Sequence, residues 1–244
     1  MIPDPGAVQI EALLDSIEPR ELAPEHRPYA IVNFVSSVDG RATLQGRSGL
    51  LGDDGDHAIF HGLRERVDAV LAGTGTLAAE RYGRILGKAE RRGRRSQSGL
   101  SPEPLACVIT RSGELPTDIP LFAEPEARII VFSGRDLDSR QFAARVEIHR
   151  LEPGESMLDE ALELLRREHG VRMLLCEGGP TLFSSMLHRG VVDELFLTVA
   201  PKLAGGGLGP PISSGLELPA PARLQVRWVL ERNGSLFIRY SLWA

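Results

Sequence analysis

Cysteine is scarce in this chain of 244 residues, and long apolar runs are missing. The two cysteines, Cys107 and Cys176, stand in apolar stretches, which favours buried, reduced thiols over a disulfide framework or a zinc cluster. No run approaches the ~18 apolar residues of a transmembrane helix. The first residues lack the basic region and the apolar core of a signal peptide. These absences predict a cytoplasmic protein without a membrane partner.

A strong charge of either sign is missing too. The formal net charge is −5, so the overall field does not favour a nucleic acid, and an anionic ligand needs a local basic patch. No shift in composition or linker divides the chain. We therefore expect an N-terminal extension over residues 1–28, with one short helix, followed by a single domain over residues 29–244.

Motifs for several kinds of catalysis are also absent. No Ser-His-Asp constellation and no pair of catalytic carboxylates is present, which leaves nucleophilic and glycosidic mechanisms without residues. His57 and His61 stand one helical turn apart, but a third metal ligand is not apparent. A packed or solvated helix face is the favoured interpretation, and no metal is expected.

Strands and helices alternate through the middle of the chain. Helical patterns cover 8–17, 53–67, 74–81, 155–170 and 180–190, and strand patterns cover 29–38, 68–73, 105–110, 128–132, 146–151, 171–177 and 193–201. Two further alternating runs flank Asn233-Gly234, a strong hairpin signal. The order predicts a three-layer α/β/α fold, with a mixed, mostly parallel sheet and a C-terminal β-hairpin.

A polar, basic stretch over residues 83–104 interrupts this alternation. Its composition predicts a long solvated loop, and closure over a phosphorylated substrate is the alternative interpretation. Its cations are concentrated at Lys88, Arg91, Arg92, Arg94 and Arg95.

Two predicted strands run into glycines and then into a helix. One ends at Gly178 and Gly179, where Pro180 suits the first helical turn, and the other ends at Gly73. Free amides and the helix dipole favour an anion at such a corner, as in phosphate sites. Either corner alone is more often an ordinary turn. Both could face one dinucleotide if their strands are neighbours in the sheet.

The order of three longer blocks is more specific. VSSVDGRAT, RVDAVLAGTGTL and CEGGPTLFSSMLHRGVVDELFLTVAPKLAGGG follow one another in the chain. Over residues 29–243 this order resembles the RibD C-terminal family, the reductase domain of bacterial riboflavin biosynthesis, which has the dihydrofolate reductase-like fold. The resemblance implies a homodimeric, NADPH-dependent 5-amino-6-(5-phosphoribosylamino)uracil reductase. Its hydride would pass from NADPH to C1′ of an imine form of the ribosyl group.

The resemblance also implies a cofactor site. Arg111 falls where the family holds the 2′-phosphate of the cofactor, and a fixed guanidinium suits that dianion. Glu80 stands where the family usually has an aspartate. The expected cofactor-binding residues are Asn33, Val35, Ser36, Gly73, Thr76, Glu80, Arg111, Gly178, Gly179, Pro180, Thr181 and Leu182.

On the substrate side, the resemblance implies catalytic roles for Glu177 and Asp39. Each has a plainer interpretation, since Glu177 could pair with an arginine and Asp39 could form an Asx turn. The expected substrate-binding residues are Ser48, Tyr82, Arg84 and Glu177.

The sequence also departs from the family. The H-x-E and P-C-x-x-C motifs of the zinc deaminase domain are missing, so deamination is excluded on this chain. ERYGRIL and RSGLLGD replace two usual substrate-side patterns. These changes leave two alternatives, a dihydrofolate or pterin reductase on the same fold and a non-catalytic NADPH-binding homologue.

Overall fold

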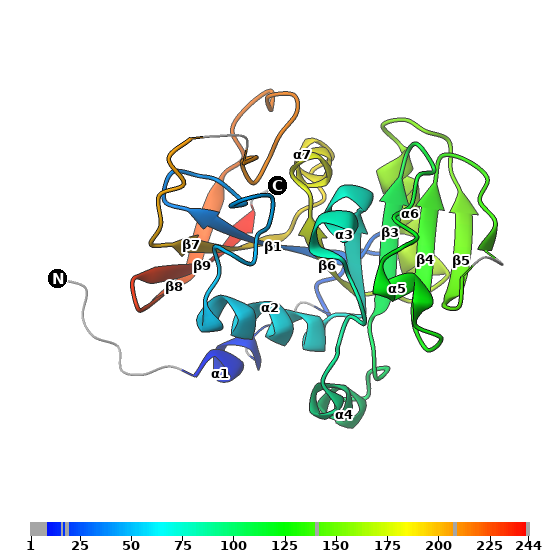
Figure 1. The fold of residues 1–244 in the computed structure, drawn as a ribbon, viewed down its shortest axis with the longest axis horizontal. Helices are drawn as coiled ribbons and strands as arrows, with labels where there is room; N and C mark the ends of the chain where they lie inside the picture. Colours follow the sequence, from blue (N-terminus) through cyan, green and yellow to red (C-terminus); the bar gives the residue numbers. More distant parts are fainter. Residues whose placement is uncertain (1–8, 16, 18–19, 140–141, 207–208, 243–244) are drawn as a thin grey trace.

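The computed structural model describes residues 9–15, 17, 20–139, 142–206 and 209–242. Nine strands of these residues form one sheet in the order β5-β4-β3-β2-β6-β1-β7-β9-β8 (Figure 1). The strands are β1 (Tyr29–Ser37), β2 (Ala69–Gly73), β3 (Leu105–Thr110), β4 (Arg128–Ser133), β5 (Arg145–Arg150), β6 (Met173–Gly178), β7 (Glu194–Ala200), β8 (Leu224–Arg232) and β9 (Ser235–Leu242).

Helices cover both faces of the sheet, which confirms the predicted three layers. Apolar residues of α1, α2, α3 and α5 pack in one core cluster against one face, and those of α6 and α7 pack in a second cluster against the other. The helices are α1 (Ile10–Asp15), α2 (Asp54–Arg66), α3 (Thr74–Glu80), α4 (Ala89–Gln97), α5 (Pro120–Ala123), α6 (Met157–Arg167) and α7 (Pro180–His188).

The central strands are parallel because each is separated from its neighbours by a crossover segment. From β5 to β7 every neighbouring pair is parallel. All nine residues of β1 are buried, as expected for a strand with helices on both sides. Its side chains alternate between the two cores, so Ile31 belongs to one cluster and Val32 to the other.

The C-terminal hairpin was predicted correctly. Asn233 and Gly234 both have positive φ, 53° and 83°, as a type I′ turn requires. β9 pairs antiparallel with β7, and β8 pairs antiparallel with β9. The hairpin therefore extends the parallel sheet at one edge, while β5 forms the other edge (Figure 1).

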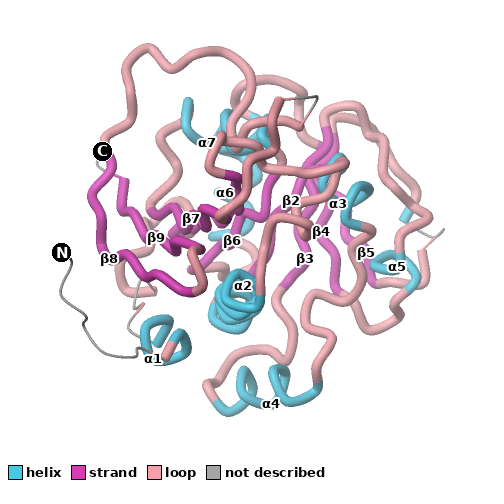
Figure 2. Tube along the Cα trace, turned by 60° about the vertical axis from the view of Figure 1, so that its left-hand side comes forward, coloured by secondary structure: helices cyan, strands magenta, loops and turns pink. Residues whose placement is uncertain are grey.

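The N-terminal extension contains the expected short helix. α1 packs on α2 at Gly62, where an added Cβ would lie 2.3 Å from Leu14 Cδ1. Figure 2 shows the two helices close together on one side of the sheet. The division into an extension and one domain remains a prediction, and the structure does not describe residues 1–8, 16 and 18–19 of the extension.

The prediction of a loop over residues 83–104 is wrong for its middle part, where the chain forms helix α4. Arg95 is buried there, and its guanidinium donates to main-chain carbonyls of Arg64, Glu65, Val67 and Ser101. The basic stretch therefore supports the end of α2, and none of residues 88–95 lines the cleft described below. The alternative of closure over a phosphorylated substrate finds no support in this arrangement.

No helix in the described ranges combines the length and the apolar character that a membrane crossing demands.

Candidate active site

A large cleft opens where the central parallel strands end. Its volume is about 1370 Å³, above the ~300–1,000 Å³ of usual ligand pockets, which leaves room for a dinucleotide and a small substrate together. The walls come from the C-terminal ends of β1, β2, β3 and β6, from α2, α3 and α7, and from loops near residues 42–49 and 210–216. This is the edge at which open α/β sheets bind ligands.

The two glycine corners meet in this cleft. β2 and β6 are parallel neighbours, as the dinucleotide hypothesis required. Gly178 and Gly179 have φ of +104° and +80°, which an L side chain rarely adopts. A Cβ on Gly179 would lie 3.2 Å from Thr76 Oγ1, so the second corner touches the first. The N-termini of α3 and α7 thus present free amides to one region of the cleft.

Arg111 follows β3, the next strand beyond β2. Its exposed side chain lines the cleft, and it makes no ion pair with any other residue that the structure describes. A free guanidinium next to two helix N-termini is suited to a phosphate.

Glu80 and Ser48 connect the loop of residues 42–49 to α3. Glu80 Oε1 accepts hydrogen bonds from the Ser48 backbone amide and from Ser48 Oγ, each at 2.8 Å. Both residues line the cleft, so the structure brings together one expected cofactor residue and one expected substrate residue.

Glu177 is the centre of a buried polar network. Arg64 Nε and Nη2 donate to its two carboxylate oxygens at 2.6 Å each, and Tyr82 Oη donates to Oε2 at 2.6 Å. The Glu177 side chain is 1% exposed. Burial and the neighbouring Glu177 raise the pKa of Tyr82 well above its ordinary value. Burial lowers the pKa of Arg64. The charge and hydrogen bonds of Glu177 outweigh this effect, so the pKa of the guanidinium is raised overall.

Arg64 was not among the predicted residues. It lies on α2, 113 residues before its partner, so no local pattern connects the two. The pairing of Glu177 with an arginine was the plainer interpretation of that residue, and the structure shows this pairing. All three side chains also line the cleft, so the predicted substrate contact of Glu177 and Tyr82 stays a prediction.

Arg84, another expected substrate residue, lies at the rim. Its guanidinium is paired with carboxylates from two neighbouring segments, which raise its pKa. These partners are Glu103, Glu124 and Glu126. The charge of Arg84 is therefore largely neutralised by a network of ion pairs within the protein.

Three predicted residues do not line the cleft, namely Ser36, Gly178 and Asp39. The Asp39 carboxylate accepts from Ser37 Oγ at 2.6 Å and from the amides of Ala204 and Gly205 at 2.9 Å. These hydrogen bonds, led by the one from Ser37, hold the pKa of Asp39 well below its usual range. Asp39 thus organises the loop after β7, and its catalytic role stays an untested prediction. The remaining expected cofactor residues that line the cleft are Asn33, Val35, Gly73, Pro180, Thr181 and Leu182.

Two residues that line the cleft, Asn33 and Asp56, each have a buried side-chain oxygen without a partner among the described residues. Asn33 Oδ1 and Asp56 Oδ1 make no hydrogen bond within the described part of the chain. Burial raises the pKa of Asp56, and a hydrogen bond with Thr198 offsets this only in part. Sequence reasoning missed Asp56, because an acid in the first turn of a helix is ordinary. Gly52 makes room for it, since a Cβ there would lie 2.3 Å from Asp56 Oδ2.

Comparison with known proteins identifies the family. The model of the RibD C-terminal domain matches residues 28–233. The chain belongs to the RibD C-terminal domain family. The resemblance seen in the sequence is thereby confirmed.

Two curated relatives that this chain covers almost completely carry the same enzyme name. The 2,5-diamino-6-ribosylamino-4(3H)-pyrimidinone 5′-phosphate reductase of Archaeoglobus fulgidus is 31% identical over 215 residues, which cover 86% of this chain and 96% of the relative. The protein of the same name from Methanothermobacter thermautotrophicus is 27% identical over 222 residues, covering 88% and 99%.

A solved structure agrees with the predicted fold. A pyrimidine reductase-like protein from Corynebacterium diphtheriae superposes with a TM-score of 0.80 at 22% identity, over 97% of this chain and 100% of that one. The dihydrofolate reductase-like α/β fold expected from the sequence is confirmed.

Proposed function

We propose that this chain is a reductase of a ribosylamino-pyrimidine 5′-phosphate, with NADPH as the hydride donor. The match to relatives named as such reductases, over 96% and 99% of their lengths, carries the proposal. The deaminase motifs are missing from these residues, so the reductive step is the one proposed for them. Because those relatives are named for the 2,5-diamino compound, we expect it to be a better substrate than the aminouracil form.

The cleft fits a phosphorylated dinucleotide. Gly179 lacks the Cβ that would crowd Thr76, and the amides at the starts of α3 and α7 face the same space. Thr76 and Gly179 would hold the diphosphate, Arg111 the 2′-phosphate, and Asn33 the nicotinamide amide through its unpartnered Oδ1. When bound, the nicotinamide supplies the hydride.

The protein's own residues supply charge and a proton. Arg64 and Tyr82 fix the position of the Glu177 side chain at the substrate side. Reduction of the C1′ imine to an amine takes up one proton at the nitrogen. Asp56, buried in the same cleft with a raised pKa, is the carboxyl suited to donate it.

One observation favours a second substrate class. Arg84 is engaged by three carboxylates, so the rim offers less free positive charge to a substrate phosphate than the family resemblance implied. A dihydrofolate or another pterin carries no such phosphate and is the alternative substrate.

The deciding experiment follows NADPH oxidation by the purified chain. The 2,5-diamino-pyrimidinone ribosyl phosphate, the aminouracil ribosyl phosphate and dihydrofolate are offered in parallel, and NADH replaces NADPH in a matched set. We expect turnover of the two pyrimidines, faster for the diamino compound, and a preference for NADPH. Turnover of dihydrofolate alone would establish the pterin alternative. NADPH binding without turnover of any substrate would indicate the non-catalytic homologue.

The proposed enzyme acts in the cytoplasm as a homodimer. The free, buried thiols of Cys107 and Cys176 fit a reducing compartment. An exposed apolar face of the C-terminal hairpin supports self-association.

A further inference from the structure

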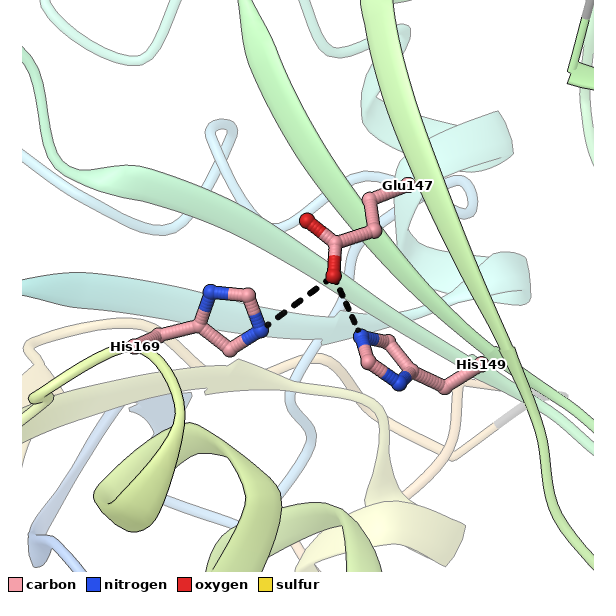
Figure 3. A group of neighbouring side chains, drawn as sticks. All are labelled: Glu147, His149 and His169. Atoms are coloured by element: carbon pink, nitrogen blue, oxygen red, sulfur yellow. Dashed lines mark hydrogen bonds and ion pairs between the residues drawn. The ribbon is translucent and has the colours of Figure 1, made fainter.

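A second group of reactive side chains lies at the far edge of the sheet. Glu147 and His149 project from the edge strand β5, and His169 follows the end of α6 (Figure 3). None of the three lines the large cleft. The reductase chemistry therefore does not account for them.

The fold brings these residues together from two elements. Positions 147 and 149 are two apart on a strand, so their side chains share one face. In the register with β4, His149 stands opposite Phe132, and the two rings lie 5.6 Å apart. α6 covers this face and ends at Arg167, and Gly170 with φ of +64° turns the chain. His169 is thereby placed over β5.

The distances suit one small cation. Glu147 Oε1 lies 2.8 Å from His149 Nε2 and 3.6 Å from His169 Nε2. One ligand atom from each residue lies within 4.8 Å of the others. Zinc bonds of about 2.0–2.2 Å in a tetrahedron place ligand atoms roughly 3.4 Å apart, so small side-chain rotations suffice.

One ring nitrogen of His169 is buried and needs a hydrogen-bond partner or a metal ion. His169 Nε2 is a buried nitrogen without a hydrogen bond in the ranges that the structure describes. An unsatisfied buried polar atom destabilises the folded state, and coordination of a metal would satisfy it. The imidazoles are 18% and 11% exposed for His149 and His169, whereas Glu147 is 56% exposed. The two imidazoles are thus largely buried, and the carboxylate lies on the solvent side of the site.

We infer that Glu147, His149 and His169 form a zinc site that fastens the edge strand β5 to the end of α6. Two imidazoles and one carboxylate are a known zinc ligand set with a fourth position for water. A hollow of about 210 Å³ beside Glu147 and His169 leaves room for that water. Arg128 and Arg145 also line the hollow, and their positive charges repel a cation. The negative charge of Glu147 opposes this repulsion.

The test is a zinc titration of the chelator-treated full chain, by calorimetry and by thermal unfolding. We expect one zinc ion per chain and a rise in Tm, because a ligand that binds only the folded state stabilises it. Cobalt(II) in place of zinc should give the intense visible bands of a four-coordinate site. His149→Gln and His169→Gln should each abolish stoichiometric binding, and Glu147→Gln should weaken it at least tenfold.

The matched control is the double variant His57→Gln/His61→Gln, which removes the histidine pair in the cleft and should bind zinc as the wild type does. No stoichiometric binding by the wild type would overturn the inference, and so would unchanged binding by His149→Gln. Loss of binding in the His57/His61 variant would move the site to the cleft and overturn it too. If His169→Gln fails to fold, His149→Gln and Glu147→Gln still decide the outcome.

Discussion

Two buried carboxyl groups share the cleft, and their partners give them different properties. Glu177 receives two hydrogen bonds from Arg64 and one from Tyr82, which fix its side chain in place. Asp56 keeps one oxygen without a hydrogen bond from any described residue, and burial raises its pKa. Two acids in different environments often take different roles in one site.

Asp56→Asn tests the proton donor. The amide keeps the size of the side chain but cannot donate in the same way, so turnover should fall about 10²–10⁴-fold. NADPH affinity, measured by fluorescence titration, should change little. Asp54→Asn is the matched control, because Asp54 lies in the same helical turn but is exposed. Equal turnover of the Asp56 variant and the wild type would exclude the donor role.

Arg111→Ala tests the 2′-phosphate contact. A charged hydrogen bond contributes about 1.5–3 kcal/mol, so NADPH should bind roughly 10–100-fold more weakly while NADH binding stays unchanged. Arg135→Ala is the control, since Arg135 is exposed near the same sheet edge but does not line the cleft. An unaltered ratio of NADPH to NADH affinity would refute the assignment.

His61 makes stability depend on pH. Burial, with the nearby charge of Arg64, lowers the pKa of His61 from 6.5 to about 4. Between these values the unfolded chain binds the extra proton, so the free energy of unfolding decreases as pH falls from 6.5 towards 4. Partial exposure limits this loss to about 1–2 kcal/mol.

Urea unfolding of His61→Gln at about pH 7 and about pH 4.5 measures this contribution. The variant should lose less stability between the two conditions than the wild type. His57→Gln, one turn earlier on an exposed position, should keep the wild-type difference. An identical pH dependence in the wild type and His61→Gln would contradict the account.

At the scale of elements, α2 is held at both ends by distant side chains. Asp53 caps its first turn, accepting from the amides of Gly55 and Asp56, and Ser235 Oγ donates to the second Asp53 oxygen. Arg95 from α4 donates to carbonyls of the last turn. Because α2 carries both Asp56 and Arg64 into the cleft, these caps position the candidate active site.

Arg95→Ala should therefore destabilise the protein. It leaves buried helix-end carbonyls without donors, and the free energy of unfolding should fall by about 2–4 kcal/mol in a urea titration. Arg94→Ala removes the adjacent, exposed arginine, and Arg91 still pairs with its partner Glu65, so the loss should be less than about 1 kcal/mol. Similar small losses in both variants would show that Arg95 does not hold the helix end.

The elements that could be predicted from the sequence are those whose own residues carry an apolar period. The strands, α6 and the hairpin have such a pattern, and each lies where it was expected. α4 has no apolar stripe, and its anchor is the arginine side chain of Arg95, so its polar composition gave the wrong prediction of a loop. The glycine corners carry a local signal, whereas the pairing of Arg64 with Glu177 exists only in the folded chain.

At the scale of the whole molecule, the sheet order explains where the cleft lies. Crossovers reach β3, β4 and β5 on one side of β2, and β6, β1 and β7 on the other. The two glycine corners stand at this reversal, between β2 and β6, which is where open α/β sheets bind ligands. The hairpin is added beyond β7, away from the two glycine corners. Its role is therefore separate from theirs.

We propose that two copies of the chain pair through this hairpin. Val226 and Val229 of β8 are about half exposed and stand opposite Tyr240 and Ile238 of β9, so they share one face. Exposed apolar faces of this kind mark interaction surfaces, and a two-fold axis would let the patch on one copy pack against the same patch on the other.

The double variant Val226→Asp/Val229→Asp should therefore convert a dimer into a monomer in sedimentation velocity, while NADPH still binds. Leu22→Asp, which alters an exposed leucine outside the sheet, should leave the dimer intact. A monomeric wild type, or a double variant that remains dimeric, would rule out this surface.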